Sequence, residues 1–66
     1  MNLTLNGNQQ DFGDIETVAQ LITSLGFADR PVLVEHNGQA LLPEEFPTTA
    51  LADGDKLELI KIVAGG

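Results

Sequence analysis

The chain has no cysteine and only one histidine, His36, which excludes several ways of building a small protein. Without thiols there is neither a disulfide framework nor a thiolate metal site, so the packing of apolar side chains must supply the stability. We expect neither a metal nor a cofactor. At 66 residues the chain is expected to form one domain with a single core, which favours a binding or carrier role over a self-sufficient enzyme.

Basic residues are scarce. Three lysines and arginines stand against ten aspartates and glutamates, which gives a formal net charge of −7. Nucleic-acid binding depends on lysine and arginine side chains that displace the counterions of the phosphates, and this chain has too few of them for such a partner. The charge would attract a partner with a basic surface, although acidic side chains on small proteins mostly serve solubility.

Long apolar runs are also missing. The first residues carry no basic segment, and no stretch has the length of a signal peptide core or a membrane span. We therefore expect a cytoplasmic protein with no membrane partner.

Two Asn-Gly dipeptides, Asn6-Gly7 and Asn37-Gly38, predict two β-hairpins, because Asn and Gly adopt the positive backbone angles of a tight turn. Each dipeptide lies between short stretches with strand-like patterns. A further turn at residues 53–55 precedes the longest predicted strand, which leads into the C-terminus. The predicted strands cover residues 1–5, 8–12, 32–35, 40–42 and 56–63, with Phe12 turned inward.

One short amphipathic helix is predicted to begin after Thr17. Thr17 and Gln20 have the spacing of a capping box, in which each side chain bonds to the backbone N–H of the other residue. Gly26 is placed to end the helix in a left-handed conformation. Four apolar residues form one stripe on this helix, namely Val18, Leu21, Ile22 and Leu25.

The order of these elements predicts the α+β class, with one helix packed across one face of one sheet. With the first and last strands parallel at the centre, the arrangement is a β-grasp (ubiquitin-like) fold, a mixed sheet of four to five strands. Between Pro43 and Pro47, Phe46 is expected to close one end of the core. We assign residues 1–63 to the β-grasp domain and residues 64–66 to a flexible C-terminal tail.

The last strand is predicted to leave apolar side chains uncovered. If Leu57 and Leu59 face the helix, alternation sends Ile60 and Ile62 to the opposite face, where the chain has no second layer. Together with Val63, these residues form a candidate partner-binding surface beside the tail. Exposed isoleucines are also ordinary in strands, which β-branched residues favour.

The chain ends in three small residues, Ala64, Gly65 and Gly66. Such a narrow end can enter a tight channel and present its terminal carboxylate. Activation by ATP turns a carboxylate into an acyl adenylate, and attack by a sulfur nucleophile then leaves a thiocarboxylate. Gly66 is therefore the candidate covalent carrier group, Gly65 and Ala64 form its tail, and no side chain is a candidate catalyst.

Two further groups of residues have simpler explanations. His36 lies in a turn beside Glu35, but neighbouring residues of a strand point to opposite faces, so the two form a poor acid–base pair. Asp53 and Asp55 flank Gly54, where aspartates stabilise a turn more often than they bind a cation.

Five segments carry a family resemblance: residues 1–7, residues 17–22, residues 34–38 with Pro43 after them, residues 53–55, and Gly65-Gly66. In these features the chain resembles, from end to end, the ThiS-type sulfur carriers of thiamine (thiazole) biosynthesis. The resemblance implies that Gly66 is adenylated by an adenylyltransferase related to ubiquitin-activating enzymes. It also implies sulfur from a cysteine desulfurase system, delivery to thiazole synthase, and partner contacts at Ile60, Ile62, Val63 and Ala64.

Other functions fit a similar chain. A molybdopterin-synthase small subunit shares the fold and the diglycine end but is usually longer, and carriers for tRNA thiolation or cysteine synthesis differ only in the acceptor. A ubiquitin-like modifier would form an isopeptide bond instead. A β-grasp interaction module would not use its tail at all.

Overall fold

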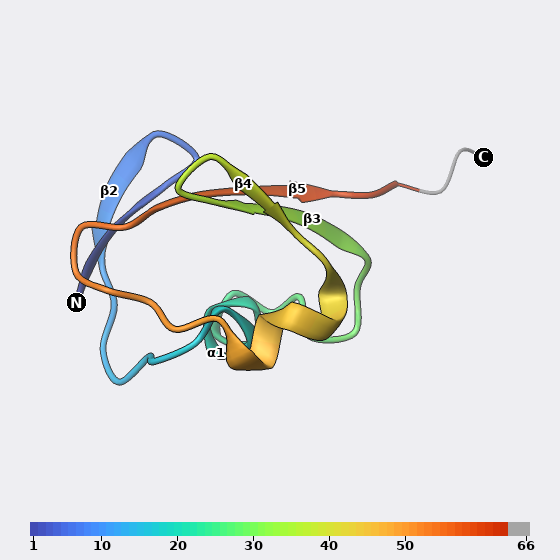
Figure 1. Ribbon diagram of the computed structural model, residues 1–66, viewed down its shortest axis with the longest axis horizontal. Coiled ribbons are helices and arrows are strands. Elements are labelled where there is room, and N and C mark those ends of the chain that lie inside the picture. The colour runs from blue at the N-terminus through green and yellow to red at the C-terminus, as the bar shows by residue number, and fades with distance from the viewer. Residues whose placement is uncertain (64–66) are drawn as a thin grey trace.

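The computed structural model describes residues 1–63, so the tail predicted at residues 64–66 lies outside the described residues. Residues 1–63 form five strands, one α-helix and one 3-10 helix (Figure 1). In chain order these are β1 (Asn2–Leu5), β2 (Asn8–Asp11), α1 (Val18–Ser24), β3 (Val32–His36), β4 (Gln39–Leu41), the 3-10 helix η1 (Pro43–Thr48) and β5 (Lys56–Lys61).

The five strands form one sheet in the order β2-β1-β5-β3-β4. β5 is the central strand, its neighbour β1 runs parallel to it, and the other pairs are antiparallel. Helix α1 lies across one face of the sheet, and in the described part of the chain the opposite face has no covering layer (Figure 1). The predicted α+β class and β-grasp arrangement are confirmed.

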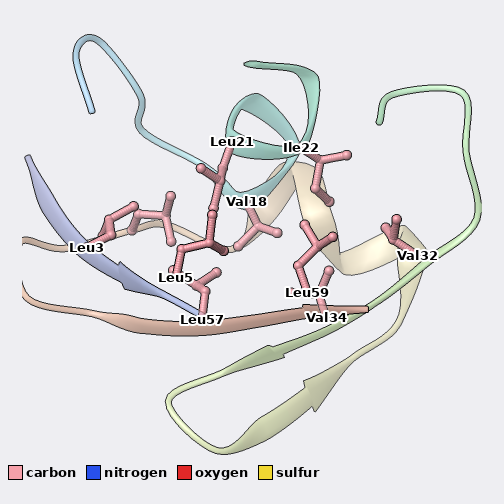
Figure 2. Close-up of a cluster of buried hydrophobic side chains, with 10 residues drawn as sticks. Leu3, Leu5, Val18, Leu21, Ile22, Val32, Val34, Leu57 and Leu59 are labelled. Atoms are coloured by element: carbon pink, nitrogen blue, oxygen red, sulfur yellow. The ribbon is translucent and has the colours of Figure 1, made fainter. Parts of the chain in front are cut away.

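The core lies between the sheet and α1. Alternate residues of the central strands point toward the helix, and three residues of α1 point back toward them (Figure 2). The buried side chains are Leu3, Leu5, Val18, Leu21, Ile22, Val32, Val34, Leu51, Leu57 and Leu59. Phe12 and Phe46, both predicted to turn inward, pack half-buried against this cluster.

Both predicted hairpin turns are present. Asn6 and Gly7 have φ angles of 49° and 84°, and Asn37 and Gly38 have 51° and 83°. Two successive positive φ angles define the type I′ geometry, whose twist matches the strands that it connects. The two Asn-Gly dipeptides therefore fix the start of the register in both hairpins.

Asn6 has a second role. Strand β1 ends at Leu5, and the Asn6 side chain continues its pairing with β5: Oδ1 accepts from the backbone N–H of Leu59 at 2.8 Å, and Nδ2 donates to the Leu59 carbonyl at 3.2 Å. The Asn6 side-chain amide thus pairs both the backbone N–H and the carbonyl of Leu59, a β5 residue that lies past the reach of β1.

The ends of α1 are fixed as predicted. The Thr17 hydroxyl accepts from the Gln20 N–H at 3.2 Å, and the Gln20 side chain accepts from the Thr17 N–H at 3.3 Å, which completes the capping box. At the other end Gly26 has a φ of 85°, and the N–H of Phe27 donates to Ile22 O at 3.0 Å. These contacts form a Schellman stop.

The last strand ends earlier than predicted, at Lys61 instead of residue 63. The N–H of Ile62 still donates to Pro31 O at 3.1 Å. Proline has no N–H with which to return the second bond of the pair, so the ladder between β3 and β5 stops here.

The interpretation of His36 as a turn residue beside Glu35 is wrong. His36 is the last residue of β3, and its Nε2 lies 2.7 Å from Oδ2 of Asp55. The same carboxylate accepts from Asn37 Nδ2 at 3.2 Å and from the Ala52 N–H at 2.9 Å. The cluster joins the turn between β3 and β4 to the start of β5, and it supports the interpretation of Asp55 as a turn-stabilising residue.

The cluster changes the acidity of Asp55. Burial opposes ionisation, but hydrogen bonds from His36, from the Ala52 N–H and from Asn37, together with the charge of His36, outweigh it. The pKa of Asp55 is therefore lowered from 3.8.

Removal of the helix cap should destabilise the fold. We expect Thr17→Ala to lower the free energy of unfolding by about 1 kcal/mol, because one N-terminal N–H of α1 loses its acceptor. Urea denaturation followed by circular dichroism measures the change. Thr23→Ala is the matched control: the Thr23 hydroxyl donates to Ala19 O at 3.0 Å inside the helix, where its loss should have little effect. Equal losses in the two variants would contradict a capping role.

The low pKa of Asp55 predicts a specific dependence of stability on pH. A carboxyl whose pKa is lower in the folded state contributes stability above its unfolded pKa of about 3.9, and this contribution is lost as the pH falls through the folded pKa. Asp55→Asn should lower stability at neutral pH and flatten the loss below about pH 4. Thermal melts between neutral and acidic pH test this, with the exposed Asp14→Asn as control; parallel curves for Asp55→Asn and wild type would disprove it.

Candidate functional site at the end of the last strand

Strand β5 determines where the C-terminal end leaves the domain. It is hydrogen-bonded to β1 on one side and β3 on the other, and the bond from Ile62 to Pro31 holds the chain for one more residue. Val63, the last described residue, is 84% exposed. The predicted tail residues Ala64, Gly65 and Gly66 lie outside the described residues, so their role stays a prediction.

The predicted exposure of the apolar residues before the tail is confirmed. Ile60 is 57% exposed and Ile62 is 48% exposed, whereas Leu57 and Leu59 are buried beneath α1. Their role in partner binding stays a prediction.

Leu33 extends this exposed surface and was missed by the sequence analysis. It lies directly opposite Ile60 on β3 and is 56% exposed. Its neighbours Val32 and Val34 are both buried, so alternation within that apolar segment could have indicated an outward side chain. The open face of the sheet thus carries an apolar cross-strand pair close to the tail.

An open groove of about 480 Å³ borders the same end of β5. It lies between the loop before β3 and the start of η1, and its largely apolar lining includes Phe27, Pro31, Leu42, Phe46 and Ile62. Ile62 therefore connects the groove with the base of the tail.

Two of the three basic residues of the chain lie at the base of the tail. Arg30 and Lys61 line a second groove together with Pro31, Ile62 and Val63. The Lys61 ammonium lies 5.5 Å from the centre of the Phe27 ring, within the range of a cation–π contact. In a chain of net charge −7, two cations thus lie beside Val63, the last described residue.

Among residues 1–63, no helix has the length and apolar character of a membrane span. The same residues contain no cluster of three or more histidine and acidic side chains placed to bind a metal ion.

Comparisons with known proteins agree with this architecture. The model of the ThiS family matches residues 3–66. A crystal structure of the thiamine biosynthesis protein (ThiS) from Geobacter metallireducens is 38% identical and covers both chains completely, with a TM-score of 0.82. A solution structure of a thiamine biosynthesis protein from the same organism is also 38% identical and covers all of this chain and 88% of that one, with a TM-score of 0.81.

A curated relative is much longer. The thiazole synthase of Paramagnetospirillum magneticum is 36% identical over 66 residues, which is 100% of this chain, and the chain spans only 20% of that protein.

The fold therefore defines a ubiquitin-like β-grasp domain whose central strand leads to an exposed Val63. The chain belongs to the ThiS family. The proteins of this family are small sulfur carriers of thiamine biosynthesis.

Proposed function

We propose that the carboxylate of Gly66 is the group that carries sulfur. An adenylyltransferase related to ubiquitin-activating enzymes joins this carboxylate to the α-phosphorus of ATP, and pyrophosphate leaves. A cysteine desulfurase system supplies the sulfur as a protein persulfide. The persulfide attacks the acyl carbon, AMP leaves with the bonding electron pair, and an acyl disulfide forms; a second thiol then breaks its S–S bond, which releases the thiocarboxylate and leaves a disulfide. Free sulfide gives the thiocarboxylate in a single displacement, and the reaction takes place in the cytoplasm.

One observation carries this proposal: the ThiS family match extends through residue 66 and so includes the diglycine end. The described strand supports it, because β5 brings the chain to an exposed position at Val63. Residues 1–63 then act as the scaffold and residues 64–66 as the tail. Three residues span at most about 10 Å when fully extended, so an enzyme that acts on the carboxylate must approach the surface around Ile60 and Ile62.

We propose thiazole synthase as the acceptor of the sulfur. The relative that bears this name contains, within one fifth of its length, a segment similar to this whole chain. A carrier segment and a synthase on one polypeptide are held at a high effective concentration, which favours transfer between them. When the carrier and the synthase are separate proteins, the synthase would have to bind the exposed surface of the carrier.

Thiocarboxylate formation can be observed directly. After incubation with the adenylyltransferase, Mg-ATP and sulfide, the intact carrier should gain the mass that corresponds to replacement of one oxygen by sulfur. A variant that lacks Gly66 should gain nothing while its circular dichroism spectrum and melting temperature stay unchanged. No mass gain in the wild type would refute the proposal, and adducts on lysines of other proteins would indicate a modifier.

The apolar surface beside the tail should contribute to recognition. Ile60→Ser should lower kcat/KM for adenylation by about tenfold, mainly through KM, because a central apolar contact contributes on the order of 1–2 kcal/mol to an interface. Leu42→Ser is the comparison: Leu42 is similarly exposed at 60% but belongs to the groove. A larger loss of kcat/KM in Leu42→Ser than in Ile60→Ser would contradict this prediction, because it would indicate that the enzyme contacts the groove instead of the open sheet face.

A further inference from the structure

Two carboxylates face each other across the open face of the sheet. The register of β3 and β5 places Glu35 directly opposite Glu58. Directly opposite side chains in an antiparallel pair have Cβ atoms about 5 Å apart, and like charges in this position destabilise the sheet. Glu35 is exposed and Glu58 is half-buried, so the pair is partly shielded from water.

Within residues 1–63 this pair has no salt-bridge partner. The ion pairs in that range are the N-terminus with Asp11 and His36 with Asp55. Lys56 precedes Glu58 by two residues on the same face of β5 but forms no salt bridge with it, and Ala40 stands opposite Glu35 on β4. No salt bridge within residues 1–63 therefore offsets the like charges of the two glutamates.

The acidic pair lies next to the apolar pair already described. Along the open face, Leu33 opposite Ile60 comes first from the tail, and Glu35 opposite Glu58 comes next. A protein that covers Leu33 and Ile60 would also exclude water from the two glutamates, and this strengthens any charge-assisted hydrogen bond made there. Covering the pair without a cation would instead bury two unpaired charges.

We infer that Glu35 and Glu58 together determine the specificity of this docking face, by receiving a guanidinium group of the adenylyltransferase. The inference rests on the proposed function, since it names a contact of the activating enzyme. A guanidinium group fits because its planar fork donates to two carboxylates at once, whereas an ammonium is a point charge. The stability that the free carrier loses to repulsion is recovered when the enzyme binds.

Neutralisation of either glutamate should have opposite effects on stability and on activation. Glu35→Gln and Glu58→Gln should each raise the melting temperature of the free carrier, because the repulsion is removed. Each should also lower kcat/KM for acyl-adenylate formation by about tenfold through KM, with kcat unchanged, and should flatten its salt dependence. Glu58→Asp, which keeps the charge, should retain most of the activity.

Glu44→Gln is the matched control, because it removes one exposed charge from η1 and leaves the open sheet face unaltered. If it lowers kcat/KM as much as the other two variants, net charge alone explains the effect and the inference is wrong. An unchanged KM in Glu35→Gln and Glu58→Gln also overturns it, as does a defect confined to sulfur transfer to thiazole synthase. If wild-type carrier is not adenylated at all, the proposed function fails first and the inference with it.

Discussion

The parallel pairing of β1 with β5 is the constraint on which the rest of the structure depends. It aligns Leu5 with Leu57, residues from opposite ends of the chain, in the middle of the sheet. Parallel neighbours need a crossover connection, and here the crossover contains α1, the second hairpin and η1. Because both strands direct leucines to the same side, one seven-residue helix is enough to cover the core.

Because α1 covers only one face of the sheet, the opposite face has no covering layer in the described residues. A chain of this size cannot cover the exposed side chains of β3 and β5, so these side chains are accessible to a partner protein. The apolar pair and the acidic pair each have one member on β5, the strand that leads to Val63. A single strand therefore carries both the exposed surface that we propose for partner binding and the connection to the proposed carrier group.

Local signals in the sequence were enough to predict the turns and the helix, because each depends on residues only a few positions apart. The order of these elements then predicted the fold class. What the sequence could not show depends on which distant residues are paired. The strand end at Lys61 follows from Pro31, the residue before β3, and the partner of His36 is Asp55, 19 residues away. At the candidate site, alternation predicted the exposure of Ile60 and could have indicated that of Leu33, whereas the pairing of these two residues across β3 and β5 required the register.

The side chain of Asn6 closes a gap that a short strand would otherwise leave. Since β1 ends at Leu5, the backbone of β5 would present an unpaired edge next to the tail, and such edges invite strands of other chains to add on. The Asn6 side chain bonds to both the N–H and the carbonyl of Leu59, so the unpaired edge is shorter although β1 itself is not extended. A residue that is suited to the turn by its backbone angles therefore also pairs backbone groups that would otherwise stay open on β5.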